Sequence, residues 1–201
     1  EWMSQAVHHL LTPISIFNLQ HLGLWAIIPA LLTYQLVIYA FHRALHGVPF
    51  LWRLHQMHHS SERLDVWSTY RTHPLELLGY VLVGFVVYSG LLGVTQEASH
   101  YAGLILLVVG VFEHTNVRTP RWLGYIIARP ENHMLHHGRT KHATNYADFP
   151  IIDMLFGTFE NPETAPEKVG FWDGASRQLG PMLMGKDVVT APKAASTSTP
   201  T

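Results

Sequence analysis

The chain has 201 residues, of which 48% are hydrophobic and only 13% are charged. This charged fraction is about half the ~25% of an ordinary soluble domain, so the composition indicates a membrane and argues against disorder. A net charge of −1 offers no basic surface for nucleic acid, and the absence of cysteine excludes disulfides, thiolate zinc sites and cysteine-ligated iron–sulfur clusters. Histidine is unusually frequent, with 15 residues against 13 lysines and arginines together.

The sequence begins at Glu1 and not at methionine, so we expect a fragment or a processed form that lacks part of its N-terminal membrane region. Residues 1–21 mix polar and apolar positions and are interpreted as a short helix at a membrane interface. Residues 22–41 carry no charge and would measure about 30 Å as a helix, which is enough to cross the hydrocarbon core. Pro29 lies within this run and is expected to kink it.

Two further uncharged runs, 77–94 and 101–112, are separated by the short link TQEASH and are interpreted as a helical hairpin. The second of these runs is short, and residues 98–100 bring it nearer to a full span. The alternative is that all three runs are core helices of a soluble protein. Three such runs in one short chain leave little polar surface, which favours a membrane bundle of about three spans.

Lysine and arginine are confined to residues 43–71 and 118–193. One span followed by a hairpin places these stretches on the same side, and the positive-inside rule makes that side cytoplasmic. Prolines punctuate residues 120–160, which are interpreted as amphipathic helix and loop. We therefore expect one all-α membrane domain over residues 1–189 and a disordered Ser/Thr/Ala/Pro tail over residues 190–201.

Eight histidines gather in three clusters: His42 and His46; His55, His58 and His59; His133, His136 and His137. Spacings of three and four residues place side chains on one helix face, and the expected topology brings all three clusters to the cytoplasmic mouth of the bundle. Neutral imidazole binds zinc, copper, iron and nickel, and eight ligands suit two ions better than one. The carboxylates of soluble di-iron bundles are missing from these clusters, so the site is expected to be nearly all nitrogen.

On these stretches the chain resembles the fatty acid hydroxylase/sterol desaturase superfamily of membrane di-iron oxygenases. The resemblance covers residues 34–160 and rests on the motifs FHRALHGVPFLWRLHQMHHSSE, TYRTHPLE, FEHTN, ENHMLHHG and NYADFPIIDMLFGTF. It implies an all-α membrane helical bundle with a cytosolic helical cap that carries the metal site. It also implies two non-haem iron ions, O₂ as co-substrate and electrons from a cytochrome b5 or ferredoxin type protein supplied by NAD(P)H.

By position, the resemblance implies nine histidine ligands: His42, His46, His55, His58, His59, His114, His133, His136 and His137. His114 matches an isolated family histidine that follows the hairpin. Some members have another histidine four positions later, where this chain has Arg118, so a tenth ligand would have to come from elsewhere.

Four other residues are candidates for binding the metal or orienting its ligands: His73, His142, Asn116 and Glu76. The stretch after the last cluster is expected to pack against the last histidine helix and fix it, through Asn145, Tyr146 and Asp153, with Gly157 as a turn residue. The remaining histidines are not expected to bind metal: His8, His9, His21 and His100.

These features predict an integral membrane enzyme that uses O₂ to hydroxylate or desaturate a bilayer lipid at an unactivated C–H bond. The residues do not select among fatty acyl, sterol and related substrates, between the two reactions, or among redox partners and oligomeric states. One alternative is a zinc-dependent membrane hydrolase, although the chain lacks His-Glu-x-x-His. Another is a non-enzymatic metal- or haem-binding membrane protein, although two haem ligands would leave six clustered histidines unused.

Overall fold

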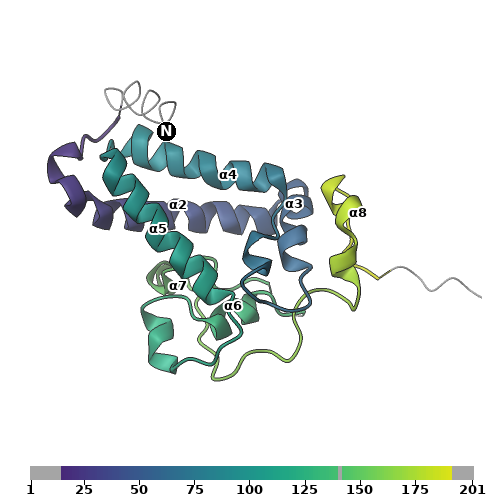
Figure 1. The fold of residues 1–201 in the computed structure, drawn as a ribbon. Helices are drawn as coiled ribbons and strands as arrows, with labels where there is room; N and C mark the ends of the chain where they lie inside the picture. The colour runs from purple at the N-terminus through teal and green to yellow at the C-terminus, as the bar shows by residue number, and fades with distance from the viewer. Residues whose placement is uncertain (1–14, 140–141, 192–201) are drawn as a thin grey trace, which may run out of the picture.

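The structure is a computed structural model that describes residues 15–139 and 142–191. These residues form helices and loops without any β-strand, which confirms the expected all-α class. Figure 1 shows the long helices α2 (Ile27–Gly47), α4 (Pro74–Phe85, continued by η4, Val86–Leu91) and α5 (Gln96–Glu113), joined to a region of shorter helices and loops. Most of the predicted interfacial helix, with His8 and His9, and most of the predicted tail lie outside the described residues.

The first apolar run forms a 3-10 helix, η2 (Gln20–Ala26), that leads directly into α2. Gly23 breaks this segment, because its φ of 53° and ψ of −129° are not helical and suit a residue without Cβ. Pro29 is the third residue of α2, where backbone N–H groups have no partner inside the helix in any case. The bend that the sequence predicted at Pro29 therefore lies at Gly23 instead.

The second and third runs form a helical hairpin. α4 continues as the π-helical segment η4 (Val86–Leu91), and α5 begins after a turn at Gly93, whose φ is 54°. Thr95 caps α5 by accepting a hydrogen bond from the Ala98 N–H at 3.2 Å. Both α4 and α5 contact α2, but α4 lies along α2 whereas α5 crosses it, so α4 and α5 diverge from their connection (Figure 1).

Within the described part of the chain, two helical segments are long and apolar enough to cross a membrane, Gln20–Gly47 and Pro74–Leu91. Only 28% and 17% of their most apolar windows are buried within the protein, whereas the core helix of a soluble protein is mostly buried. The outward-facing apolar side chains of these helices favour a membrane setting over the core of a soluble protein. α5 has 18 residues but begins with Gln96 and Glu97, so its role as a third span stays a prediction.

Proline is the first residue of four helices: α3 (Pro49–His59), α4, α6 (Pro130–His136) and α7 (Pro150–Phe156). Its fixed φ and missing N–H suit the first helical position. The region expected to be helix and loop contains α6, α7 and the 3-10 helix η5 (Arg121–Tyr125). Gly157 ends α7 with a φ of 72°, which confirms it as a turn residue. The other short elements are η3 (Ser68–Tyr70), η6 (Ala175–Arg177) and α8 (Leu179–Leu183).

Small side chains form the seam at which α2, η4 and α5 pack. The fully buried residues of this seam are Ala26, Ala30, Val87, Val94, Ala98 and Ala102. Small residues let helix backbones approach closely, which is a common way for membrane helices to associate. The seam lies at the end of α2 opposite to its histidines, so it fastens one end of the three helices and leaves the other to polar groups.

A buried arginine fixes the loops around α6. The Arg129 side chain is fully buried, and its Nε donates to Asn161 Oδ1 at 2.8 Å. Its other nitrogens donate to the carbonyls of Thr119, at 3.2 Å, and Pro162. Its charge is paired with Glu131, whose Oε2 lies 3.0 Å from Nη1. Because Arg129 directly precedes α6, this network sets where the last histidine helix begins.

Replacement of Arg129 by alanine should lower the free energy of unfolding by about 3–5 kcal/mol, because it leaves the buried Glu131 carboxylate without its partner. Denaturant titration of the protein in detergent micelles measures this change. Arg63→Ala is the matched control, since the Arg63 side chain is 75% exposed in its ion pair with Asp65 and should contribute less than about 1 kcal/mol. Equal losses in the two variants would show that Arg129 is not a structural clamp.

Candidate metal centre

Four helices and their ends bring the predicted ligands together. α2 carries His42 and His46 one turn apart, and α3 carries His55, His58 and His59. The other four lie at the end of α5 and around α6: His114, His133, His136 and His137. Val48, in an extended conformation, links α2 to α3, and the two helices contact each other. Segments far apart in sequence thus present their histidines to one region.

The ring nitrogens form two separate groups. Group A consists of His42, His46, His55, His59 and His136, and group B consists of His58, His114, His133 and His137. Within each group, one ring nitrogen of every histidine lies within 4.8 Å of that of every other. All nine histidines that the sequence predicted as ligands fall into one group or the other. Eight of them are buried and His46 is half-buried.

Three histidines of group A have fixed ring orientations. His42 Nδ1 donates to the Tyr146 carbonyl at 2.8 Å, and His136 Nδ1 donates to the Thr144 carbonyl at 2.6 Å. His55 Nδ1 lies 2.6 Å from a carboxylate oxygen of Glu76. In a neutral imidazole a protonated Nδ1 leaves a lone pair on Nε2. Nevertheless His42 Nε2 lies 3.0 Å from His55 Nε2 and 3.1 Å from His136 Nε2.

Group B shows the same arrangement. His114 Nδ1 donates to the Gly110 carbonyl at 2.7 Å, so its Nε2 carries the lone pair. That Nε2 lies 3.3 Å from His58 Nε2 and 3.1 Å from His133 Nε2. His133 Nε2 in turn lies 3.0 Å from His137 Nε2. The ring nitrogens of group B therefore also converge.

The spacing of the nitrogens fits one metal ion in each group. Lone pairs that face each other at such distances repel unless a proton or a cation lies between them, and in His42, His55, His114 and His136 the Nδ1 contacts already use the ring proton. Metal–nitrogen bonds of about 2.1 Å at right angles would separate neighbouring nitrogens by about 3.0 Å. Four further ring nitrogens are buried without a hydrogen-bond partner among the described residues: His46 Nε2, His58 Nδ1, His59 Nδ1 and His137 Nδ1. This donor set suits imidazole-binding metals such as iron and zinc.

Burial keeps these imidazoles in the form that binds metal. Desolvation lowers the pKa of His114 to about 4, because the charged ring loses its hydration. It lowers the pKa values of six further histidines well below the usual 6.5: His55, His58, His59, His133, His136 and His137. Since a metal ligand must be unprotonated, the groups are ready for metal at neutral pH.

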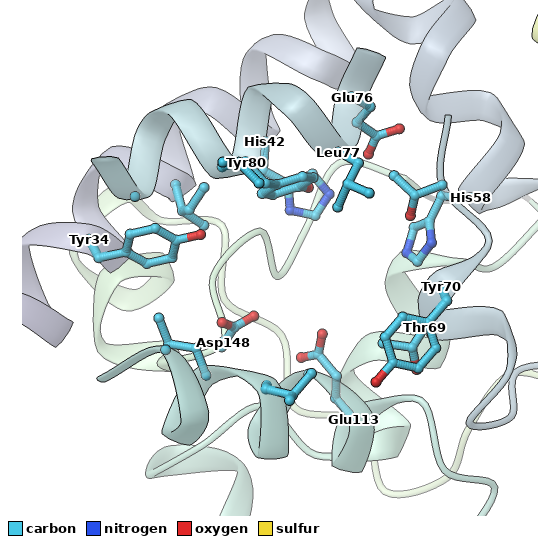
Figure 2. A pocket seen from close by; sticks show the side chains of 18 of the residues that line it. Tyr34, His42, His58, Thr69, Tyr70, Glu76, Leu77, Tyr80, Glu113 and Asp148 are labelled. Atoms are coloured by element: carbon cyan, nitrogen blue, oxygen red, sulfur yellow. The ribbon is translucent and has the colours of Figure 1, made fainter. Parts of the chain in front are cut away.

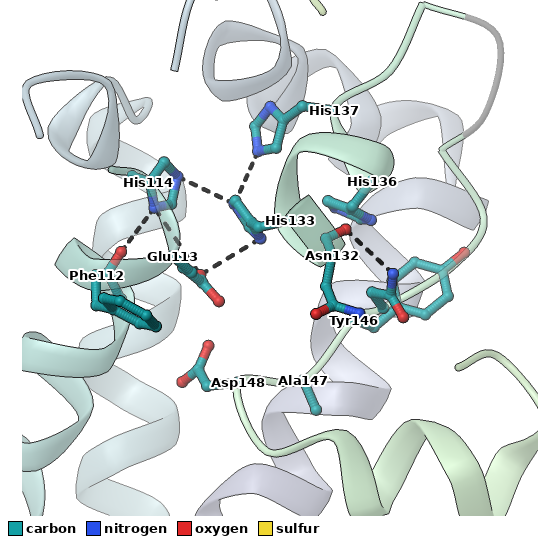
Figure 3. Close-up of polar contacts among 12 residues, drawn as sticks. Phe112, Glu113, His114, Asn132, His133, His136, His137, Tyr146, Ala147 and Asp148 are labelled. Atoms are coloured by element: carbon teal, nitrogen blue, oxygen red, sulfur yellow. Dashed lines mark hydrogen bonds and ion pairs between the residues drawn. The ribbon is translucent and has the colours of Figure 1, made fainter. Parts of the chain in front are cut away.

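In each group a carboxylate lies near the outer ring nitrogen, Nδ1, of a histidine. Glu76 contacts His55 of group A, and both side chains are 1% exposed. Glu113 faces group B, with its Oε1 3.4 Å from His133 Nδ1 and 3.9 Å from His114 Nδ1 (Figure 3). A carboxylate on the outer nitrogen of a ligand histidine orients the ring and increases its basicity. Sequence analysis missed Glu113, although its position directly before His114 at the end of an apolar helix was a usable signal.

Three other candidates lie outside both groups. His73 caps α4 by accepting the Leu75 N–H at 3.1 Å, and its Nε2 lies 3.3 Å from the Leu183 carbonyl. His142 Nδ1 lies 3.2 Å from the His136 carbonyl, and the ring packs against His59. Asn116 is exposed. Exposed His21 and His100 also lie apart from the groups, as expected.

The stretch after α6 fixes the last histidine helix, as the sequence predicted. Asp153 accepts hydrogen bonds from the backbone N–H groups of Tyr146, at 2.8 Å, and Ala147, at 2.9 Å. Asn145 adopts a φ of 55°, which asparagine tolerates, and its side chain donates to the Asn132 carbonyl of α6 at 3.1 Å. The Tyr146 carbonyl that orients His42 is held in place by these bonds.

A cavity of about 520 Å³ extends from the histidines between α2, α4 and α5. His42, His58, His114 and His133 form its inner end, and Figure 2 shows Tyr34, Glu113 and Asp148 around it. No lysine or arginine belongs to the described lining. Asp148, which sequence analysis also missed, accepts from Gln35 Nε2 at 2.7 Å, and burial raises the pKa of its carboxyl to about 6. The cavity suits a largely apolar ligand beside the metal groups.

Loss of one ligand should empty the corresponding group. His136→Ala in group A and His58→Ala in group B should each reduce the metal content by roughly one ion per chain, because each removes one coordinating nitrogen. Mass spectrometry of detergent-purified, iron-reconstituted protein measures the content. His100→Ala, on the exposed start of α5, should retain the full content. Full occupancy in both ligand variants would refute the assignment of the groups.

The carboxylate behind group A should strengthen metal binding. Glu76→Gln should weaken iron affinity about 10- to 100-fold, because the amide lacks the charge that polarises His55. Competition with a chromogenic chelator measures the affinity. Glu97→Gln, at an exposed position on α5, serves as the control and should bind as the unaltered protein does. An unchanged affinity in Glu76→Gln would contradict this role.

Comparison with known proteins places this arrangement in a family. The model of the fatty acid hydroxylase family matches residues 27–158. An ornithine lipid hydroxylase, OlsE of Rhizobium tropici, is 35% identical over 62% of this chain and 39% of its own length. Human alkylglycerol monooxygenase is 33% identical over 72% of this chain and 33% of its own length. A very-long-chain aldehyde decarbonylase of Oryza sativa subsp. indica is 33% identical over 70% of this chain and 25% of its own length.

No solved structure matches the chain. The chain spans between a quarter and two fifths of the length of these curated relatives. The family match nevertheless covers more than half of the chain and includes all nine histidines of groups A and B. The chain belongs to the fatty acid hydroxylase family.

Proposed function

We propose that this protein is a membrane oxygenase that uses two non-haem iron ions and O₂ to hydroxylate or desaturate a lipid at an unactivated C–H bond. The observation that carries the proposal is the convergence of nine imidazoles on two points at the inner end of an apolar cavity. Family membership supports lipid oxidation, because relatives named for ornithine lipid hydroxylation and alkylglycerol monooxygenation share this region.

Group A would hold one iron through up to five imidazoles, and group B would hold the other through up to four. Iron bound there would supply the reduction of O₂ and the oxidation of the substrate C–H bond. The all-imidazole donor set leaves the ions positively charged, and Glu76 and Glu113 offset part of that charge from behind the ligands. The hydrogen bonds of His42, His55, His114 and His136 keep their Nε2 lone pairs directed inward.

The cavity positions the substrate and excludes water. Its walls are mostly apolar, with Leu77, Val81 and Leu107 among the lining residues, so an alkyl segment of a lipid would bury its surface there. The absence of lysine and arginine from the described lining disfavours a phosphate or carboxylate group inside the cavity. A neutral or cationic lipid with its hydrocarbon beside the metal groups fits best, and the two relatives named for lipid oxidation suggest alkylglycerols and ornithine lipids as first substrates to test.

The topology supports a site on the cytoplasmic side. All lysines and arginines lie in the stretches that also carry or border the histidines, and none lies on α2 before Arg43 or on α4 and α5. We propose α5 as a third span and the segments from α6 onward as a cytosolic cap over groups A and B. A cytoplasmic site would be accessible to a cytochrome b5 or ferredoxin type donor reduced by NAD(P)H.

The test combines metal analysis with isotope transfer. Purified, iron-reconstituted protein is supplied with NADPH, ferredoxin reductase, ferredoxin and ¹⁸O₂, with an alkylglycerol, an ornithine lipid or a free fatty acid in separate reactions. We expect about two irons per chain, coupled in the Mössbauer spectrum. We also expect an ¹⁸O-labelled hydroxyl group on one of these lipids, or a new double bond.

His136→Ala is the inactive control, and it should still insert into the membrane. One tightly bound zinc that iron cannot replace, with hydrolysis of an ester lipid, would instead establish the hydrolase. A Soret band with two histidine ligands would establish a haem protein. Either result would refute the oxygenase.

A further inference from the structure

The cavity has one side that the described residues 15–139 and 142–191 do not close. Its back wall is α2, where Ile38 and His42 are both buried. Its other walls are α4 and α5, which contact α2 and diverge from each other. Figure 2 shows α4 and α5 on opposite sides of the cavity with the lining side chains between them.

On α4 and α5, the exposed residues that line the cavity are apolar; Tyr70 of η3, 61% exposed, also lines it. Leu77 and Val81 on α4 line the cavity and are 57% and 60% exposed, and Leu107 on α5 lines it and is 48% exposed. Gly103 is also exposed and lies one helical turn before Leu107. We call Leu77, Val81, Gly103 and Leu107 the rim. Pro74–Leu91, which contains the α4 part of the rim, is one of the two described segments able to cross a membrane, so in a bilayer the opening would face hydrocarbon.

Glycine keeps the α5 edge open. Gly103 and Gly110 are seven residues apart, which places both on the helix face that lines the cavity. A Cβ added at either position would meet no atom within 4 Å. Glycine inside a helix is about 1 kcal/mol less favourable than alanine, so two glycines on this face reduce helix stability where side chains would have fitted. The space they leave is continuous with the cavity.

Ionisable side chains line the inside of the cavity, whereas its rim is apolar. Glu76, Glu113 and the histidines lie at the inner end and Asp148 lies nearer Tyr34 (Figure 2), whereas no ionisable side chain belongs to the rim. A lipid headgroup would lose its hydration if it crossed this apolar opening, and that loss costs free energy. An alkyl chain already in the bilayer has no hydration to lose.

We propose that the slot between α4 and α5 is a lateral portal through which an alkyl chain passes from the bilayer to the metal groups. This inference deepens the proposed function, because it assigns the route by which the lipid reaches that site. The occupant of the slot is the hydrocarbon chain of a bilayer lipid.

The absence of cysteine from the chain allows a site-specific block. Leu107→Cys places a thiol on the rim. Leu104→Cys places a thiol on the same helix at a similarly exposed position (54%, against 48% for Leu107) that does not line the cavity. Val81→Cys and Leu82→Cys form the corresponding pair on α4, with Leu82 52% exposed and outside the lining. Each variant is reconstituted in phosphatidylcholine vesicles and labelled with a bulky, membrane-permeable maleimide.

Access is measured without turnover. A palmitic acid analogue with a chain diazirine and a terminal alkyne is irradiated with each iron-loaded sample in the absence of O₂ and reductant, and the labelled peptides are identified by mass spectrometry. Maleimide on the thiol of Leu107→Cys or Val81→Cys should reduce photolabelling of the cavity residues by at least about ten-fold. A loss of this size is expected if the block keeps only two methylene groups of the probe from being buried in the cavity. Maleimide on the thiol of the control variants, Leu104→Cys and Leu82→Cys, should leave photolabelling unchanged.

Gly103→Leu narrows the slot without a chemical label and should reduce photolabelling in the same way. Metal content, measured on every sample, should stay constant, since none of these positions belongs to group A or group B. Equal photolabelling in the rim and control variants would overturn the portal, as would photocrosslinks showing that a second copy of the chain covers the slot. Because photolabelling requires no oxidation, a failed oxygenase assay with rim-dependent photolabelling would reject the proposed function and retain the portal.

Discussion

The main constraint on this structure is that it holds imidazole nitrogens close together in a buried space, where their lone pairs repel each other. Hydrogen bonds to Nδ1 fix several rings so that their Nε2 atoms approach at 3.0–3.3 Å, and four other ring nitrogens are buried without partners among the described residues. A cation between the nitrogens would offset both their repulsion and the loss of their hydration. The surrounding helices, loops and outer carboxylates are best understood as the framework that holds these rings against their repulsion.

Helix geometry divides the histidines between the two groups. In each His-x-x-His-His motif all three histidines lie on one broad helix face, but the last points about 40° to one side of the first and the middle one about 60° to the other side. On α3, His55 and His59 accordingly join group A and His58 joins group B. On α6 the assignment is reversed, with His133 and His137 in group B and His136 in group A. Two copies of one motif thus build two sites side by side.

The rest of the fold serves these sites from opposite ends. At one end, small side chains such as Ala30 and Ala102 draw α2, η4 and α5 together. The helices then diverge toward the histidines, and the divergence creates the cavity and its open side. At the other end, Arg129 and Asp153 fix the loops that carry α6 and the Tyr146 carbonyl through buried hydrogen bonds. These polar groups are fully engaged, as buried polar groups in a metal-supporting framework must be.

The sequence by itself determined the helical class, the apolar segments and the eight clustered histidines, because each is written in local composition and spacing; the ninth, His114, followed only from the family resemblance. Uncharged runs of membrane length and histidines three or four apart need no knowledge of distant residues. Only the tertiary structure decided which histidines share a group, that Glu76 contacts His55, and that Glu113 and Asp148 face the cavity. It also showed that the apolar segment bends at Gly23, where the sequence had predicted a bend at Pro29, and that His73 caps α4. These features depend on the distances between residues far apart in the chain, and such distances are set by how the helices pack.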